Sequence, residues 1–142
     1  MMRFFKTTIF LFFIALGFSG FSQDSRKNKY KNLSPKEFYV FMYADKNSVL
    51  IDVSTIEEYE ESHIGNSLLA ENSKKLFSII DTVDFEQAIF VYCEYGDRSS
   101  QACKLLNNKG FKEVCNLKGG LRAWLKSGYK VDSTKKSIEL GF

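Results

Sequence analysis

Short apolar runs alternate along the chain with stretches in which apolar residues recur at helical spacing. Runs rich in β-branched and aromatic residues are typical of strands buried in a sheet. Four such runs are Val49–Val53, Leu68–Ala70, Ala88–Tyr92 and Val114–Leu117. Helical spacing predicts helices over residues 34–46, 55–59, 73–80, 99–109 and 121–127. Because strands alternate with helices, we expect an α/β domain around a mostly parallel sheet.

Residues that favour helix ends support these boundaries. Ser34, Pro35 and Glu37 form the pattern of a capping box with a proline in the first turn. Ser54 or Thr55 is expected to cap the next helix, and Gly110 is expected to end the helix that begins at residue 99.

Residues 1–22 have the pattern of a secretory signal peptide. Arg3 and Lys6 precede the apolar stretch Ile9–Phe18, and the small residues Gly20 and Ser22 suit a cleavage site. We therefore expect an exported protein, periplasmic or secreted. An uncleaved membrane anchor is the alternative, but the apolar stretch is shorter than the roughly 20 residues of a spanning helix, so no stable membrane span is expected.

The composition of residues 23–142 predicts three further segments. Residues 23–33 are polar and basic and are predicted to be a linker, residues 34–131 a single domain, and residues 132–142 a C-terminal tail. The 142 residues carry a net charge of +3, to which the first six residues contribute two charges. Such a balance gives no reason to expect binding to nucleic acid.

One segment between a predicted strand and a predicted helix carries reactive side chains. It reads Cys93-Glu94-Tyr95-Gly96-Asp97-Arg98. Backbone N–H groups of such a loop, together with the helix N-terminus, point toward the cysteine sulfur and stabilise a thiolate and bound anions. We therefore predict Cys93 as a nucleophile, cradled by the backbone amides of residues 94–98. Four residues separate the cysteine from Arg98, whereas cysteine phosphatases have five, so the pocket suits one sulfur atom better than a phosphoryl group.

The chain resembles the rhodanese-like sulfurtransferases over roughly residues 49–131. Three segments carry the resemblance, in the family's order: Leu50-Ile51-Asp52-Val53 with Glu58-Tyr59 and His63-Ile64, then the cysteine loop, then Gly110-Phe111 with Leu117-Lys118-Gly119-Gly120-Leu121-Arg122-Ala123-Trp124. The resemblance implies a three-layer α/β/α fold with a central sheet of about five strands. It also implies a cysteine that takes sulfur from a donor, holds it as a persulfide and passes it to a nucleophilic acceptor.

The chain departs from the family pattern at several positions. Ser54 replaces a frequent arginine, and the turn Ser62–Ser67 lacks the usual proline. Glu94 and Asp97 are expected to face the approach to Cys93, and they leave the loop side chains with one net negative charge, which is unfavourable for thiosulfate. The acidic loop favours either a cationic protein donor or a module that only binds a partner.

Other polar residues near the predicted loop have alternative roles. Asp52, at the carboxyl end of a strand, either positions Arg98 or the loop amides, or caps the following helix. Arg98 either binds an anionic donor or braces the loop through its carbonyls. The single histidine, His63, is predicted to be structural, and without a second histidine or a Cys-x-x-Cys pair no metal site is indicated. Cys103 and Cys115 are expected to be free thiols, although a bridge between them is conceivable in an exported chain.

The sequence thus predicts a sulfurtransferase that moves sulfane sulfur from thiosulfate or a persulfide to a thiol or cyanide through a Cys93 persulfide, without a cofactor. The alternative is a non-catalytic rhodanese-like module that binds a partner protein or a reactive sulfur species. A thiol phosphatase is a third possibility, disfavoured by the loop length.

Overall fold

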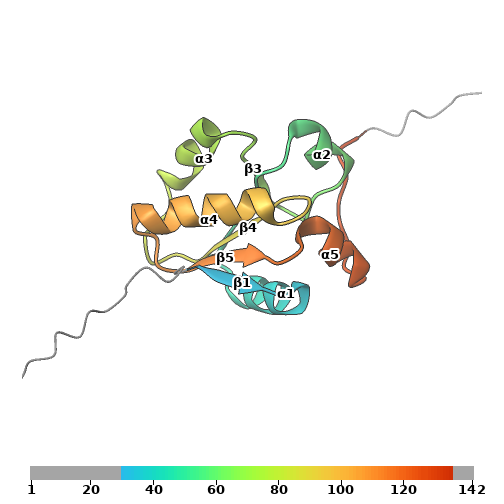
Figure 1. Ribbon diagram of the computed structural model, residues 1–142, viewed down its shortest axis with the longest axis horizontal. Helices are drawn as coiled ribbons and strands as arrows, with labels where there is room; N and C mark the ends of the chain where they lie inside the picture. The colour runs from blue at the N-terminus through green and yellow to red at the C-terminus, as the bar shows by residue number, and fades with distance from the viewer. Residues whose placement is uncertain (1–29, 136–142) are drawn as a thin grey trace, which may run out of the picture.

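The apolar runs form the strands of a parallel sheet. The computed structural model describes residues 30–135. Its strands are β1 (Lys31–Leu33), β2 (Val49–Asp52), β3 (Leu68–Leu69), β4 (Ile89–Tyr92) and β5 (Val114–Leu117), in the order β1-β5-β4-β2-β3. Every pairing is parallel, so all five strands end at the same edge of the sheet (Figure 1).

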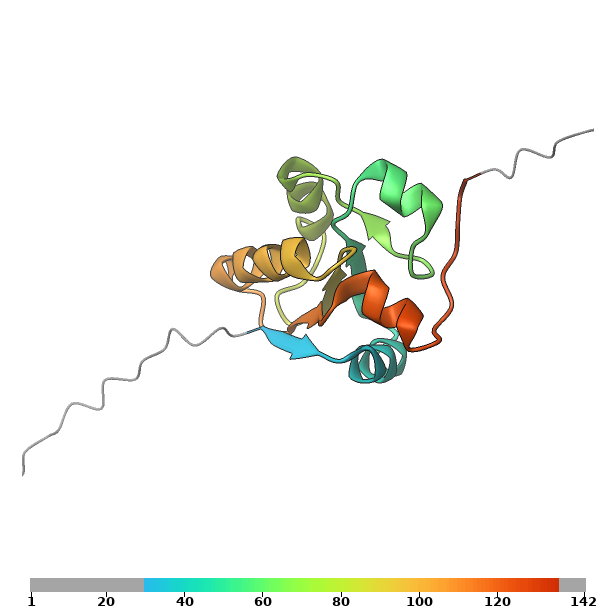
Figure 2. The same ribbon diagram turned by 45° about the vertical axis from the view of Figure 1, so that its right-hand side comes forward.

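Helices cover both faces of this sheet, as predicted. They are α1 (Pro35–Ala44), α2 (Ile56–Glu61), α3 (Ser73–Ile80), α4 (Asp97–Lys109) and α5 (Gly120–Lys126). Helices α1 and α5 pack on one face, and α3 and α4 pack on the other (Figure 2). The three-layer α/β/α fold is therefore confirmed.

Strand β4 lies at the centre and separates two apolar clusters. Its side chains alternate, so that Ile89 and Val91 join the cluster under α3 and α4, whereas Phe90 and Tyr92 join the cluster under α1 and α5. Trp124 of α5 is 1% exposed in the second cluster. A strand buried on both faces holds its carboxyl end firmly, and that end leads directly into the cysteine loop.

The predicted helix ends are found. Ser34 and Thr55 each form a complete capping box, so Thr55 rather than Ser54 caps α2. Gly110 ends α4 with a φ of 105°, a left-handed conformation that favours glycine.

Backbone pairing extends past two of the predicted boundaries. Residues 31–33, assigned to the linker, form β1, because Lys31–Leu33 pairs in parallel with Cys115–Leu117. Residues 132–135, assigned to the tail, belong to the domain: Asp132 forms an antiparallel bridge with His63. Both segments are short and polar, so their backbone pairing leaves no hydrophobic pattern in the sequence.

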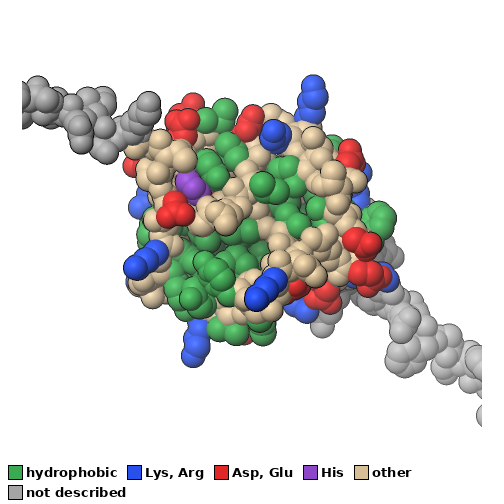
Figure 3. Space-filling view, turned by 180° about the vertical axis from the view of Figure 1, so that it is seen from behind, with side chains coloured by type: hydrophobic (Ala, Val, Ile, Leu, Met, Phe, Trp, Pro, Cys, Tyr) green, Lys and Arg blue, Asp and Glu red, His purple; other side chains and the backbone are tan. Residues whose placement is uncertain are grey.

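The outer face of α1 is apolar. Phe41 and Tyr43 are 49% and 58% exposed, and Val40 lies beside them. Figure 3 shows hydrophobic side chains gathered over this part of the surface. No helix within residues 30–135 has the length and hydropathy needed to cross a bilayer. The predicted signal peptide lies outside the described residues.

Candidate active site

The cysteine loop begins where β4 ends, at the carboxyl edge of the sheet. Cys93 follows Tyr92 and is completely buried. Gly96 turns the chain into α4 with a φ of 94°, and a Cβ there would lie 3.0 Å from the carbonyl oxygen of Leu117. The tight turn therefore depends on glycine both for its backbone conformation and for its close approach to β5.

The sulfur of Cys93 accepts hydrogen bonds from the start of α4. The backbone N–H groups of Gly96 and Ser99 lie 3.1 Å and 3.4 Å from Sγ. The hydroxyl of Ser99 lies 3.4 Å from the same atom, and the Cys93 thiol donates to Oδ1 of Asp97 at 3.8 Å. Within the predicted cradle the donor to sulfur is Gly96, and the second amide belongs to Ser99, one residue beyond the predicted segment. The N–H groups of Gly96 and Ser99 stabilise negative charge on sulfur, whereas the carboxylate of Asp97 opposes it.

Neighbouring elements hold the loop in place. The N–H groups of Leu121 and Arg122, at the start of α5, donate to the carbonyl oxygens of Cys93 and Glu94 at 2.8 Å and 3.1 Å. The buried side chain of Asn116 in β5 donates to the carbonyl oxygen of Gly96 at 3.4 Å. The loop is thus tied to β5 and α5 before any ligand binds.

Arg98 forms an ion pair that the sequence did not predict. Its guanidinium donates to both carboxylate oxygens of Glu58, at 2.8 Å and 3.0 Å. These bonds lower the pKa of Glu58 and raise the pKa of Arg98. Glu58 also accepts from the backbone N–H of Thr55, so one carboxylate both caps α2 and holds Arg98.

Asp52 takes neither of its predicted roles. Its Oδ1 accepts a hydrogen bond from the N–H of Ser54 at 2.9 Å, while the cap of α2 is Thr55 and the partner of Arg98 is Glu58. Asp52 is fully buried, and burial raises the pKa of this carboxyl group. It therefore supports the turn after β2 rather than the arginine.

The two acidic residues of the loop differ in their surroundings. Glu94 pairs with Arg122 at 2.5 Å, and the guanidinium of Arg122 also lies over the ring of Tyr95. Asp97 approaches the sulfur instead. The prediction that both carboxylates face Cys93 is therefore wrong for Glu94, whose charge is directed to α5.

The remaining candidates have structural positions. The ring of His63 stacks on Tyr59 with centroids 4.0 Å apart, and its Nδ1 lies 2.8 Å from the carbonyl oxygen of Tyr59, which confirms the structural prediction. Cys103 and Cys115 are free and buried, as expected. Burial raises the pKa of Cys103 and raises that of Cys115 to about 11, so both remain protonated thiols.

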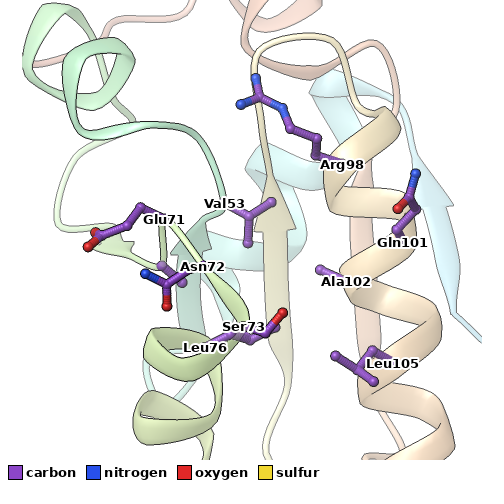
Figure 4. A pocket seen from close by; sticks show the side chains of 10 residues that line it. Val53, Glu71, Asn72, Ser73, Leu76, Arg98, Gln101, Ala102 and Leu105 are labelled. Atoms are coloured by element: carbon purple, nitrogen blue, oxygen red, sulfur yellow. The ribbon is translucent and has the colours of Figure 1, made fainter.

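Two hollows flank the ion pair between Arg98 and Glu58. One is a cavity of about 390 Å³ between α3 and α4, which we call the α3–α4 cleft (Figure 4). The other, of about 370 Å³, contains Glu61, Glu94 and Arg122. Arg98 lines the first hollow and Glu58 lines the second, so their ion pair stands between the two.

The fold and the loop together define a class: α/β proteins that present a single cysteine in a tight loop at the carboxyl end of a central strand. Comparison with protein families identifies the family within this class: the model of the rhodanese-like domain matches residues 34–127. The chain belongs to the rhodanese-like domain family.

Individual relatives agree with this assignment. The thiosulfate sulfurtransferase GlpE of Coxiella burnetii is 35% identical over 95 residues, which make up 67% of this chain and 87% of GlpE. A rhodanese-like domain protein from Staphylococcus aureus superposes with a TM-score of 0.61 at 23% identity, covering 75% of this chain and 99% of that one. A thiosulfate sulfurtransferase from Pseudomonas aeruginosa gives a TM-score of 0.66 at 19% identity, over 75% of this chain but 21% of its own. The two structures show the same fold.

Proposed function

We propose that the protein is a sulfurtransferase that carries sulfane sulfur as a persulfide on Cys93. The observation that supports this most strongly is the environment of one sulfur atom. Cys93 accepts N–H bonds from Gly96 and Ser99, whereas Cys103 and Cys115 are buried thiols held in their protonated form. Membership of the rhodanese-like family and the similarity to GlpE support the same reaction.

The reaction has two balanced steps. The Cys93 thiolate attacks the sulfane sulfur of the donor, the donor's S–S bond breaks, and sulfite or a thiolate leaves with the electron pair. A nucleophilic acceptor, either a thiolate or cyanide, then attacks the outer sulfur of the persulfide, and the Cys93 thiolate is released. The N–H groups of Gly96 and Ser99 stabilise the negative charge on Sγ before and after each turnover.

Replacement of single cysteines tests this proposal. Cys93→Ser is expected to abolish sulfur transfer and to leave the fold intact, because a hydroxyl of similar size forms no persulfide. Cys103→Ala is the matched control: it removes a buried thiol, so it is expected to lower stability by about 1 to 2 kcal/mol while transfer continues. Appreciable transfer by Cys93→Ser, with thermal unfolding showing a folded protein, would mean that the nucleophile is another group.

A second candidate function is a non-catalytic module that binds a partner protein. The apolar outer face of α1, with Phe41 and Tyr43 about half exposed, is the observation in its favour. This candidate requires partner binding that survives Cys93→Ser and is lost when Phe41 is replaced by a charged residue, together with an absence of sulfur transfer in the parent protein.

We also propose that the protein is exported, to the periplasm or to the outside of the cell. The argument rests on residues 1–22, where a basic start is followed by an apolar stretch and two small residues. N-terminal sequencing of the exported protein is expected to begin near Gln23. Recovery of the intact N-terminus in a membrane fraction would support an anchor instead.

A further inference from the structure

Strand β1 contacts the cysteine loop through a chain of side-chain hydrogen bonds. It lies beside β5 at the edge of the sheet, with Asn32 opposite Asn116 (Figure 1). Nδ2 of Asn116 donates to Oδ1 of Asn32 at 2.9 Å and to the carbonyl oxygen of Gly96 at 3.4 Å. Asn116 is 3% exposed. Its amide group therefore links β1 to the cysteine loop inside the protein.

Tyr30, the residue before β1, makes a second contact near the same point. Its hydroxyl lies 2.7 Å from the hydroxyl of Ser100, and its ring packs against the apolar cluster under α3 and α4. The N–H of Ser100 donates to the carbonyl oxygen of Gly96 at 3.2 Å, which is the first hydrogen bond of α4. That carbonyl oxygen thus accepts from Ser100 and Asn116, and both of these residues are bonded to the segment of β1.

The first turn of α4 supplies both backbone amides that bind the reactive sulfur. The N–H groups of Gly96 and Ser99 lie 3.1 Å and 3.4 Å from Sγ of Cys93. Helices α1, α2 and α3 each begin with a side-chain cap, whereas α4 begins at Gly96 and has none. Because glycine is the least restricted residue, contacts from outside the turn have to fix its conformation.

Contacts from α5 fix a different part of the loop. The N–H groups of Leu121 and Arg122 bond the carbonyl oxygens of Cys93 and Glu94, at the start of the loop. The contacts from Tyr30 and Asn116 act at its end, where the loop becomes a helix. The two sets of contacts therefore hold opposite ends of one short turn.

We propose that Tyr30 and Asn116 are positioning residues, which hold the first turn of α4 so that its amides stay directed at Cys93. Amides that are fixed before the reaction stabilise charge on sulfur without rearranging during it. Loss of either side chain lets the turn move and slows the chemical step rather than weakening the binding of the donor. In its effect on turnover, this inference rests on the proposed sulfur transfer by Cys93.

Hydrogen exchange, measured by NMR, tests the two contacts without relying on sulfur transfer, because it reports local opening. The variants Tyr30→Phe and Asn116→Ala each remove one contact. In both variants the amides of Gly96 and Ser99 are expected to exchange about fivefold faster, the factor that corresponds to one hydrogen bond of about 1 kcal/mol. Tyr30→Phe keeps the ring and loses only the hydroxyl, so it decides the question even if Asn116→Ala folds poorly.

Turnover gives the second readout. In both variants kcat for sulfur transfer from thiosulfate to cyanide is expected to fall by about fivefold, with KM for thiosulfate within about twofold of the parent value. Asn72→Ala is the matched control, because it removes the cap that accepts the N–H of Lys75 at the start of α3. It is expected to lower stability and to change neither kcat nor the exchange of the two amides.

Three results would overturn the inference. They are unchanged exchange in both Tyr30→Phe and Asn116→Ala, an equal increase in Asn72→Ala, and faster exchange with an unaltered kcat. If the parent protein transfers no sulfur, the proposed function fails, whereas exchange of the Gly96 and Ser99 amides still shows whether β1 holds the turn.

Discussion

Asp97 is the acidic residue of the cysteine loop whose carboxylate contacts the reactive sulfur. Glu58 and Glu94 are neutralised by arginine partners, whereas Oδ1 of Asp97 lies 3.8 Å from Sγ. Two unit charges about 4 Å apart interact by about 1 kcal/mol in water and by about 4 kcal/mol at an effective dielectric constant of 20. The charge of Asp97 should therefore oppose capture of an anionic donor more strongly than the charge of Glu94.

Asp97→Asn is expected to raise kcat/KM for thiosulfate by about fivefold or more, because the change removes the negative charge beside Sγ. Added salt should raise thiosulfate activity in the parent protein, through screening, and should do so less in the variant. Steady-state kinetics over a range of ionic strength measure both effects. Asp84→Asn, at an exposed turn before β4, is the control for net charge. A thiosulfate rate that is unchanged in Asp97→Asn would show that this carboxylate does not control donor entry.

The carboxyl group of Asp52 affects stability rather than donor binding, because it is buried and forms no ion pair with Arg98. Burial raises its pKa above the ordinary value of 3.8, so ionisation of Asp52 costs folding free energy at neutral pH. That cost is relieved as the pH falls through the raised pKa toward 3.8. The free energy of unfolding of Asp52→Asn minus that of the parent should therefore be more positive at pH 7 than at pH 4. Urea unfolding at both pH values measures the difference, and an equal difference at both would contradict this account.

The sequence located the reactive residues better than their partners. Cys93 and Arg98 stand out because a buried strand, a short loop and a helix follow one another. Glu58 and Arg98 lie forty positions apart in the chain, and no local pattern in the sequence links their two side chains. Ser99 was assigned to the start of a helix, and its contact with sulfur follows only from the turn at Gly96.

At the scale of elements, the start of α5 fixes the cysteine loop. Gly120 has a φ of 63°, and a Cβ there would lie 2.5 Å from the carbonyl oxygens of Cys93 and Glu94. Gly128 has a similar φ of 84°, but its Cβ would meet nothing within 4 Å. The two glycines thus share the same backbone preference and differ in their approach to the loop.

Gly120→Ala is therefore expected to lose more stability than Gly128→Ala and to lose sulfur transfer as well. Alanine in a left-handed conformation costs about 1 to 2 kcal/mol, which is the loss expected for Gly128→Ala alone. Urea unfolding and a transfer assay of both variants provide the comparison. Equal losses of stability, with full activity in both, would mean that the start of α5 does not hold the loop.

Strong strands and helices were predictable from the hydrophobic pattern, whereas short pairing segments were not. The run that became β4 is apolar at every position, and the capping boxes mark α1 and α2. Strand β1 has three residues, two of them exposed, and owes its position to hydrogen bonds with β5. A strand of three residues with one buried apolar side chain, Leu33, is too short to show a repeating pattern in the sequence.

At the scale of the whole molecule, the domain extends past the predicted boundary at residue 131. The N–H of His63 donates to the carbonyl oxygen of Asp132 at 2.9 Å, and the N–H of Asp132 donates back at 2.8 Å. The N–H of Thr134 donates to the carbonyl oxygen of Glu60 at 3.0 Å. These contacts join the end of the described chain to α2, the helix that carries Glu58.

A chain that ends at Val131 should consequently be less stable than one that ends at Lys135. At about 1 kcal/mol for each hydrogen bond, the expected loss is about 2 to 3 kcal/mol. Both chains lack the same later residues, so urea unfolding compares them directly. Equal stability would show that residues 132–135 only lie against the domain.

The central claim, that Cys93 carries the transferred sulfur, is tested most directly by mass spectrometry. The purified protein is incubated with thiosulfate or 2-hydroxyethyl persulfide, and its intact mass and peptides are measured before and after treatment with a thiol reductant. The account predicts one added sulfur atom on the peptide that contains Cys93, removed by the reductant, absent from Cys93→Ser and retained in Cys103→Ala. Sulfur on Cys103 or Cys115, or on no cysteine with either donor, would contradict it.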